Sequence, residues 1–453
     1  MLNHPNLKTE ENIITNESQL TEIFCSGIKP DSIIKQKRVG VEFEKLPVRK
    51  SDFKAAPYID VAKFLLAYKE NNLHGIYENN AILGLSGDAG TISLEPGSQT
   101  EISLNPSNNL LEVKRTLENY NKVTSQIAEK FGIYWLGYGI QPVSTYKNIN
   151  IIPKKRYEYM TKYLPTVAKK PLVMMRETSG IQSSFDYSSE EDAMKKFALA
   201  LKLSPIVSAM FANSPIRNGR LSGYKSNRAA SWLDTDNDRC GLVSSKAFGK
   251  DFSFEQYAQI LLDVPMIFIE RNINGFKTAI KTENITFRQF LKSGWQGFIA
   301  NKQDWETHLS LYFPDVRFKN YIEIRNHDNQ RPELICAVPA FWKGLIYNDS
   351  AIDAVSDIIR DLTYFDIEYL RRKTPKHGLD MKIKHIPLKH LAREITDISY
   401  TSLKSYGQGE EVLLEPLLCL LEKGLTPADI IIEKWQNEWR ADISKLVSYS
   451  RLV

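Results

Sequence analysis

The fold is decided by the segment Arg38-Val-Gly-Val-Glu-Phe-Glu-Lys45, in which apolar and polar residues alternate. A period of two predicts a β-strand with the valines and the phenylalanine on one face and Glu42 and Glu44 on the other. At a rise of ~3.3 Å per residue, the two carboxylates lie ~6.6 Å apart on the same face and repel each other. A pair of divalent cations, typically ~3.5–4 Å apart, would remove the repulsion. The alternative is the solvated face of an edge strand.

A second acidic segment is Thr91-Ile-Ser-Leu-Glu-Pro-Gly-Ser-Gln-Thr-Glu-Ile-Ser103. Two short β-like pieces flank its Pro-Gly turn, and Glu95, Gln99 and Glu101 share one parity. The glycines at every third position of 84–90, just before it, suit either a phosphate-binding loop or a hairpin turn. The hairpin is favoured, since the chain has no Walker A sequence.

A third such segment is Arg317-Phe-Lys-Asn-Tyr-Ile-Glu-Ile-Arg325, in which Tyr321, Glu323 and Arg325 share a face. Three strands with carboxylates on one face predict a sheet whose concave side binds a hard, oxygen-ligated cation such as Mg²⁺. Arg325, one strand position beyond Glu323, is suited to neutralising a phosphoryl group during its transfer.

Composition describes an ordinary globular protein: 453 residues, 42% hydrophobic and 25% charged, with a net charge of +5. No apolar run approaches the ~20 residues of a membrane span, and the polar N-terminus lacks a secretory apolar core. The four cysteines are widely spaced, without a CxxC or zinc pattern. We therefore expect a cytoplasmic protein with reduced thiols and no membrane partner.

The predicted organisation is a polar leader over 1–30 and one catalytic domain over 31–453, with a mostly helical layer from about 350. Amphipathic periodicity predicts a helix within 107–131, capped by Ser107 or Asn108, and the apolar stretch 134–140 predicts a central strand. The basic segment 371–390 is the best nucleic-acid signal. Without interleaved aromatic residues it favours a solvated basic face, so no nucleic-acid partner is expected.

A series of motifs in the chain resembles the plant-type glutamate–cysteine ligases, within the carboxylate–amine ligase group. The motifs are RVGVEFEK (38–45), SLEPGSQTEIS (93–103), GYGIQP (137–142), PKKRYEYM (153–160), FANSP (211–215), WLDTDNDRCG (232–241), DVPM (263–266), TFRQFL (286–291), YIEIR (321–325) and CAVPAFWKGLIYND (336–349). They occur in order over nearly the whole chain. The resemblance implies an α+β fold: a curved, mainly antiparallel sheet that forms an open, funnel-like active site backed by helices, as in the glutamine-synthetase-like ligases.

The same resemblance implies ATP-dependent ligation of glutamate to cysteine through γ-glutamyl phosphate, the first step of glutathione biosynthesis, with two or more Mg²⁺ ions. The implied metal ligands are Glu42, Glu44, Glu101 and Glu323, with Glu95 and Gln99 either joining them or ordering the strand. Arg325 and Glu323 are the expected catalytic residues. Expected substrate-binding residues are Arg156, Arg228, Arg239, Gln182 and Trp232. The oligomeric state is left open between monomer and homodimer.

The chain departs from the family pattern in the segment that ends with Asp186. The family pattern R-T-x-x-x-Q-x-N-x-D has Glu177 here in place of its Arg and Ser184 in place of its Asn. Because this strand lines the substrate side in relatives, a different amine substrate is the main alternative. Cys336 lies at a position used in redox disulfides of plant relatives, without an assignable partner. A non-catalytic relative and a glycoside hydrolase, the latter suggested by the paired carboxylates, are the remaining alternatives.

Overall fold

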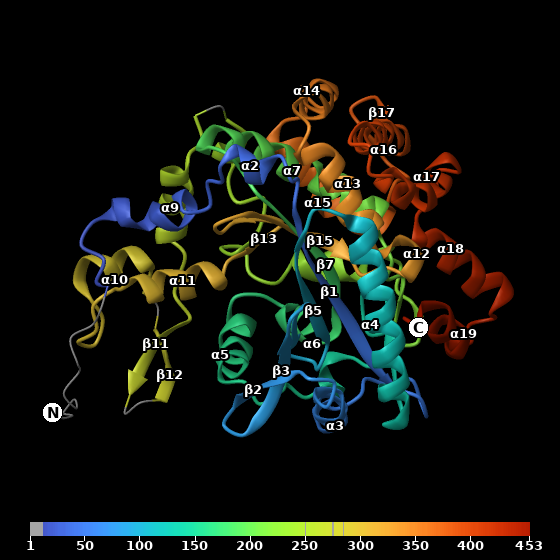
Figure 1. Cartoon of the computed structure of the whole chain (residues 1–453), viewed down its shortest axis with the longest axis horizontal. Helices are drawn as coiled ribbons and strands as arrows, with labels where there is room; N and C mark the ends of the chain where they lie inside the picture. The colour runs from blue at the N-terminus through green and yellow to red at the C-terminus, as the bar shows by residue number, and fades with distance from the viewer. Residues whose placement is uncertain (1–11, 250, 274–275, 284) are drawn as a thin grey trace.

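The computed structural model describes residues 12–249, 251–273, 276–283 and 285–453. The alternating segment at 38–45 lies in β1 (Val39–Arg49), at the centre of a nine-stranded sheet (Figure 1). The strand order is β14 (Val316–Phe318), β15 (Ile322–Asp328), β7 (Gly180–Phe185), β1, β5 (Thr100–Ser107), β4 (Gly90–Leu94), β3 (Ala81–Gly87) and β2 (His74–Glu78), and β6 (Ile133–Leu136) pairs with the distal half of β1. Neighbouring strands in this sheet run antiparallel.

The register of the sheet aligns the acidic positions on one face. On β1, Glu42 is paired with Ser103 of β5 and with Gln182 of β7, and Glu44 is paired with Glu101 of β5. The opposite face of β1 carries the apolar residues of the alternating segment, and these are buried in the core. The alternation therefore separates a polar face from a core face, as the pattern predicts.

Helices cover the apolar face of the sheet. The main ones are α7 (Glu190–Met210), which packs on β15 and β14, α13 (Ala337–Ile346), which packs on β7, and α4 (Leu110–Lys130), beside β5 and β6 (Figure 1). Ser189 caps α7 by accepting the N–H of Asp192. The cap of α4 is Asn109, one residue after the expected Asn108. The predicted α+β class, an antiparallel sheet backed by helices, is confirmed.

Shorter elements make up the rest of the chain before residue 348. The helices are α1 (Glu22–Cys25), α2 (Asp31–Ile34), α3 (Tyr58–Lys69), α5 (Lys155–Tyr163), α6 (Pro171–Glu177), α8 (Asn227–Trp232), α9 (Phe254–Leu262), α10 (Phe287–Ser293), α11 (Lys302–Ser310) and α12 (Pro332–Ile335). The small strand pairs are β8 (Ile216–Arg217) with β9 (Arg220–Leu221), β10 (Cys240–Gly241) with β13 (Phe313–Pro314), and β11 (Phe268–Ile273) with β12 (Phe276–Lys281).

The chain after residue 348 is mostly helical, as expected. It contains α14 (Asp349–Ile358), α15 (Tyr364–His377), α16 (Leu388–Ser405), α17 (Glu415–Glu422), α18 (Pro427–Glu433) and α19 (Ile443–Ser450), with one small hairpin, β16 (Lys382–Ile383) and β17 (Ile386–Pro387). Of these, α15 lies against α7 and α8 and so reaches the sheet. In the described part of the chain, no helix combines the length and apolar character needed to cross a lipid bilayer.

Three details differ from the sequence-based expectations. Part of the expected leader packs into the core, where Leu20 and Phe24 are fully buried; residues 1–11 of it lie outside the described residues. The strand expected to be central, β6, is short and lies off the main strand order, paired with the distal half of β1. The segment 317–325 is a hairpin, with Arg317 of β14 paired to Glu323 of β15.

The glycine-rich segment 84–90 agrees with the favoured expectation: it is a plain hairpin turn between β3 and β4.

Candidate active site

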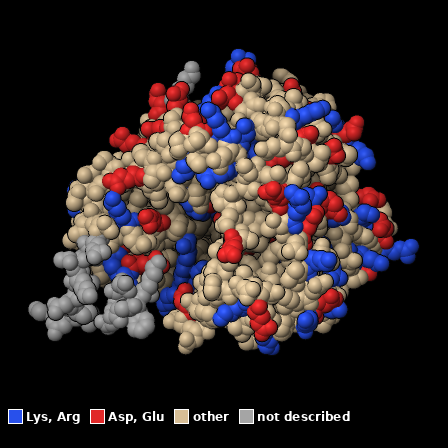
Figure 2. Space-filling model, in the orientation of Figure 1, with Lys and Arg blue, Asp and Glu red and all other residues tan. Residues whose placement is uncertain are grey.

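A cavity of about 310 Å³ lies over the polar face of the sheet. Its lining residues are Glu42, Glu44, Glu95, Pro96, Gln99, Glu101, Lys154, Arg156, Tyr157, Met160, Met174, Met175, Thr178, Gln182, Arg228, Trp232, Ser310, Phe313, Arg317, Lys319 and Arg325. They come from β1, β5, β7, β15 and the segments that face them. Figure 2 shows the surface hollowed near the centre of this view, with Lys and Arg side chains gathered along the rim.

Four carboxylates form the acidic wall of the cavity. Glu44 accepts the Gly180 N–H at 2.5 Å, Glu101 accepts the Gln182 amide at 3.1 Å, and Glu95 accepts the Tyr157 hydroxyl at 3.2 Å. Burial, opposed in part by Arg228, raises the pKa of Glu44 to about 7. Burial and the neighbouring carboxylates hold the pKa of Glu101 well above its usual range. Burial and the charge of Glu323 also raise the pKa of Glu42.

This donor set suits a hard cation. The carboxylates are crowded enough to raise one another's pKa, and a bound cation relieves such repulsion by favouring the ionised forms. Among the described residues, no group of three or more His, Cys, Asp or Glu side chains is arranged to hold a metal ion by itself. Mg²⁺ is usually bound through one or two carboxylates together with substrate phosphates and water, so an open acidic wall fits it better than a closed cage.

Glu323 lies behind this wall and is fully buried. Its carboxylate accepts from Arg317 at 2.5 Å, Arg325 at 2.6 Å and Lys319 at 2.9 Å. Burial alone would raise the pKa of Glu323, but the three cations outweigh it and hold this pKa well below its usual range. Both oxygens are therefore engaged, and the arrangement favours an orienting role for Glu323 over the expected metal ligation.

Gln182 connects the acidic wall to Arg325, on the cationic side of the cavity. Its amide nitrogen donates to Glu101, and its amide oxygen accepts from Arg325. Because the same Arg325 nitrogen also donates to Glu323, the guanidinium is fixed at the edge of the cavity. Its position opposite the carboxylates is the one that charge neutralisation of a phosphoryl group requires.

Three more of the predicted substrate-binding residues line the cavity: Arg156, Arg228 and Trp232. Arg228, only 4% exposed, donates to the Arg325 carbonyl at 2.8 Å, and its Nε atom has no partner in the structure. Arg156 donates to the hydroxyl of Ser310 at 3.0 Å and to its carbonyl at 2.8 Å. The buried Arg228 and the partly buried Arg156 thus face the cavity, and among the described residues neither forms an ion pair with a carboxylate, as a site for an acidic substrate needs.

Two expected site residues have other partners. Arg239 is not among the residues that line the cavity, and it forms a buried ion pair with Asp236 at 2.8 Å. Gln99 lines the cavity, but its amide oxygen accepts the Gly97 N–H at 2.7 Å and its nitrogen donates to the Thr178 carbonyl at 2.8 Å. Of the two roles considered for Gln99, the structure favours ordering the β4–β5 turn.

Sequence reasoning missed Arg317 and Lys319 as site residues. Both line the cavity, and both donate to Glu323. The signal was present, since the two share the parity of Glu323 and Arg325, but it required recognising the hairpin at residues 319–321. Cross-strand pairing then brings Arg317 directly opposite Glu323.

The model of glutamate–cysteine ligase family 2 matches residues 38–449. The chain belongs to this family. It is 35% identical to the chloroplastic glutamate–cysteine ligase of Arabidopsis thaliana over 95% of this chain and 83% of the relative. It is also 35% identical to chloroplastic glutamate–cysteine ligase A of Oryza sativa subsp. indica over 96% of this chain and 88% of that one. The protein is therefore an enzyme, a ligase.

Among solved structures, the glutamate–cysteine ligase of Francisella tularensis in complex with AMP is similar with a TM-score of 0.48. The identity is 13% over 91% of this chain and 88% of that chain. The sequence matches correct one expectation. A cytoplasmic location was expected, but the similar curated ligases of Arabidopsis thaliana, Oryza sativa and Brassica juncea are chloroplastic enzymes, which contradicts that default.

The departures from the family pattern lie outside the main cavity of this ligase. Glu177 is fully buried, accepts from Arg217 at 2.6 and 2.8 Å, and does not line the cavity. Ser184 lines a neighbouring hollow of about 170 Å³ that it shares with Glu42 and Arg38. The altered segment therefore leaves the cavity wall at Gln182 in place.

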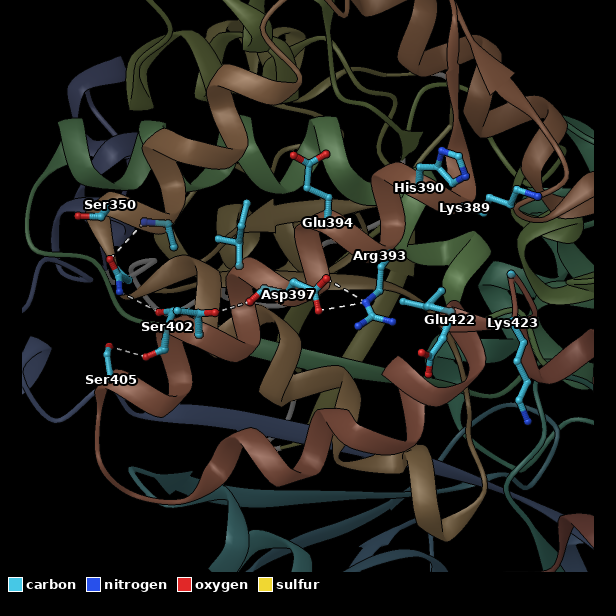
Figure 3. Close-up of a pocket in the computed structure, with 16 residues that line it drawn as sticks. Ser350, Lys389, His390, Arg393, Glu394, Asp397, Ser402, Ser405, Glu422 and Lys423 are labelled. Atoms are coloured by element: carbon cyan, nitrogen blue, oxygen red, sulfur yellow. Dashed lines mark hydrogen bonds and ion pairs between the residues drawn. The ribbon is translucent and has the colours of Figure 1, made fainter.

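A larger open groove of about 890 Å³ lies in the C-terminal helical layer of the ligase, remote from the acidic wall. Figure 3 shows it between α16 and the ends of α14 and α17, with Arg393 turned onto Asp397. The Arg393–Asp397 pair, at 2.9 Å, is half-exposed on one helix face. The groove lacks the facing carboxylates and buried arginines of the cavity over the sheet, so size does not identify the active site here.

Proposed function

We propose that the ligase joins the γ-carboxylate of L-glutamate to the amine of L-cysteine, with ATP as co-substrate and Mg²⁺ as cofactor, giving γ-glutamylcysteine. The observation that carries this proposal is the cavity over the sheet, in which an acidic wall faces buried arginines. Membership in glutamate–cysteine ligase family 2 supports the choice of substrates.

Ligation proceeds in two steps. A γ-carboxylate oxygen of glutamate attacks the terminal phosphorus of ATP, and ADP leaves, which gives γ-glutamyl phosphate. The amine nitrogen of cysteine then attacks the acyl carbon of the γ-glutamyl phosphate, the bond from this carbon to the phosphate oxygen breaks, phosphate leaves, and the amine proton passes to solvent. Negative charge accumulates in the first step, so catalysis depends mainly on positioning and electrostatic stabilisation.

The acidic wall is the proposed Mg²⁺ site, with Glu42, Glu44 and Glu101 as ligands and Glu95 as an additional one. Bound Mg²⁺ would neutralise the nucleotide phosphates. In this proposal the Glu44 pKa of about 7 means that the cation must displace a proton at acidic pH. Glu101 is held in place through Gln182.

The arginines on the cationic side of the cavity have two proposed roles. Arg325, fixed by Glu323 and Gln182, stabilises the charge on the transferring phosphoryl group. Arg228 and Arg156 bind the carboxylates of glutamate, and Trp232 forms the apolar side of that subsite beside Arg228. No histidine is among the residues that line the cavity, so the proposal assigns no imidazole base.

We also propose that residues 31–453 work as one catalytic unit. One contiguous cluster of buried residues includes Val41 of β1, Leu203 of α7 and Leu391 of α16. The sheet and the C-terminal helices thus share a core, and separating them would expose it.

The test is phosphate release from ATP with Mg²⁺ and glutamate, measured with cysteine and with a panel of other amines. Stimulation confined to cysteine is expected. Stimulation by another amine would retain the fold and mechanism but change the second substrate. No release with any amine would reject turnover, and nucleotide binding without release would indicate a non-catalytic relative.

A further inference from the structure

Arg371 differs from the rest of the basic segment at 371–390. The other Lys and Arg residues of that segment are exposed, as a solvated face predicts, whereas the Arg371 side chain is only 11% exposed. Its neighbour Arg372 is 61% exposed. Arg371 lies on α15, which packs against α7 and α8 beneath the active site. A solvated basic face does not explain why the Arg371 side chain is buried.

The Arg371 guanidinium is held in a formed site. Its Nε donates to Asp315 at 3.2 Å, and a second nitrogen lies 3.9 Å from Glu368. A Cβ on Gly241 would lie 3.1 Å from the central guanidinium carbon, so a side chain there would crowd the guanidinium. Gly241 also has a φ of +106°, which disfavours any side chain there.

Asp315 connects Arg371 to Arg325. The Asp315 carbonyl accepts the backbone N–H of Arg325 at 3.0 Å, and its carboxylate also accepts the Ser204 hydroxyl at 3.1 Å. Arg371 itself is not among the residues lining the active cavity. It lines a small inner cavity together with Asp315, Arg228 and Arg325. Arg371 therefore acts on the active site through Asp315 and not by contact with substrate.

The same helix holds the segment that carries Arg228. Pro375 of α15 accepts the N–H groups of Lys225 at 2.8 Å and Ser226 at 3.0 Å. Ser226 is the N-cap of α8, the helix that includes Arg228. Pro375 lies in the last turn of α15, where helix carbonyls have no partner within the helix, so its carbonyl is free to accept these N–H groups.

We propose that α15 positions Arg228 and Arg325 of the active site, and that Arg371 is a positioning residue for Arg325, acting through Asp315. The proposal rests on the proposed function, because it takes Arg325 to be the phosphoryl-stabilising residue. It makes the C-terminal helical layer a determinant of catalytic rate.

The kinetic test compares Arg371→Met with the matched control Arg372→Met on the same helix, well below the unfolding temperature. Arg371→Met is expected to lower kcat on the order of 10- to 100-fold, with KM for glutamate changing less, because a misplacement of about 1 Å costs rates of this size. Arg371→Lys keeps the charge and should restore part of kcat. Arg372→Met should stay within twofold of the wild type.

A double-mutant comparison tests the route through Asp315. Arg371→Met and Asp315→Asn remove the same ion pair, so the double variant should be no slower than the slower single variant. If the two losses multiply, or if Arg371→Met matches Arg372→Met in kcat, the positioning role is overturned.

Hydrogen exchange gives a readout that needs no turnover. Peptides covering 316–328 should exchange faster in Arg371→Met than in Arg372→Met, because the Arg325 N–H loses its fixed acceptor. Unchanged exchange would overturn the coupling even in an active enzyme. If the wild type releases phosphate with an amine other than cysteine, the same variants are compared on that amine, so the substrate assignment can fail while the positioning role stands.

Discussion

Glu44 of β1 lies directly across from Glu101 of β5 in the antiparallel register, and both side chains face the same cavity. Like charges directly opposite each other destabilise a sheet. Burial strengthens the effect, because the carboxylates lose water as well as gaining a like-charged neighbour. A pair arranged in this way costs stability in the free protein, which is the expected signature of a cation-binding site.

Glu44→Gln should abolish Mg²⁺-dependent turnover while leaving the protein folded. Glutamine has the same shape but no charge, so the cation loses a ligand of the acidic wall. We expect a loss of at least about 100-fold in phosphate release. A Mg²⁺ titration of activity measures it, with Glu118→Gln, on the half-exposed Glu118 of α4, as the matched control. Full activity of Glu44→Gln at saturating Mg²⁺ would remove Glu44 from the metal site.

In the metal-free protein, the contribution of Glu44 to stability should fall as the pH rises from 5.5 to 8, whereas the lowered pKa values of the buried His308 and His327 act in the opposite direction. The pKa of Glu44 is about 7 in the folded protein against a usual value near 4.5, so in this range the folded state keeps a proton that the unfolded state has lost. Linkage then lowers the free energy of unfolding by about 2 kcal/mol between these pH values. The raised pKa values of Glu42 and Glu101 act in the same direction. The lowered pKa of Glu323 contributes no change above pH 5.5.

Chemical denaturation at the two pH values, with and without Mg²⁺, checks this prediction. In the absence of metal, the stability of Glu44→Gln relative to the wild type should rise by about 2 kcal/mol between pH 5.5 and 8. Mg²⁺ should stabilise the wild type more at pH 8 than at pH 5.5, because it competes with protons. An unchanged stability difference between wild type and Glu44→Gln across these pH values would contradict the raised pKa of Glu44.

Arg325→Lys should lower kcat far more than it raises KM for glutamate. Arg325 reaches the cavity while donating to Glu323 and Gln182, and a lysine cannot keep this fork geometry. Loss of one preorganised donor to a developing charge typically costs about 10²–10³ in kcat. Arg372→Lys, on the surface of α15, is the control for a generic Arg-to-Lys change. An effect confined to glutamate KM would instead assign Arg325 to glutamate binding.

The acidic face was predictable from sequence because strand periodicity is local. Alternation places Glu42 and Glu44 together without knowledge of any neighbour, and the Pro-Gly turn brings Glu101 onto the next strand. Glu323 was placed on the same face, but the set of three cations that donate to its carboxylate was not predicted. Its three cationic partners depend on a hairpin whose turn, at residues 319–321, has no glycine or proline to mark it.

Longer-range relationships had no local signal. Arg239 occurs in a segment rich in arginine and aspartate, and which of them face the cavity depends on pairing that only the fold settles. Arg371 looks like one more basic residue of a solvated face until α15 is packed against Gly241 and Asp315. Sequence patterns thus identified candidate site residues, whereas the contacts that hold those residues in place could be found only from the tertiary structure.

A Glu177 variant tests whether the altered segment changes the amine substrate. Its carboxylate is fully buried, accepts two bonds from Arg217 and one from the Tyr146 N–H at 2.7 Å, and lies outside the cavity lining. Glu177→Gln should therefore cost about 2 kcal/mol of stability, the scale of lost charge-assisted hydrogen bonds, with the amine KM within twofold of wild type. Glu129→Gln, which removes an exposed pair with Lys50, is the control. A changed amine KM at unchanged stability would show that Glu177 affects substrate choice after all, and that position 177 acts on the cavity through the end of α6.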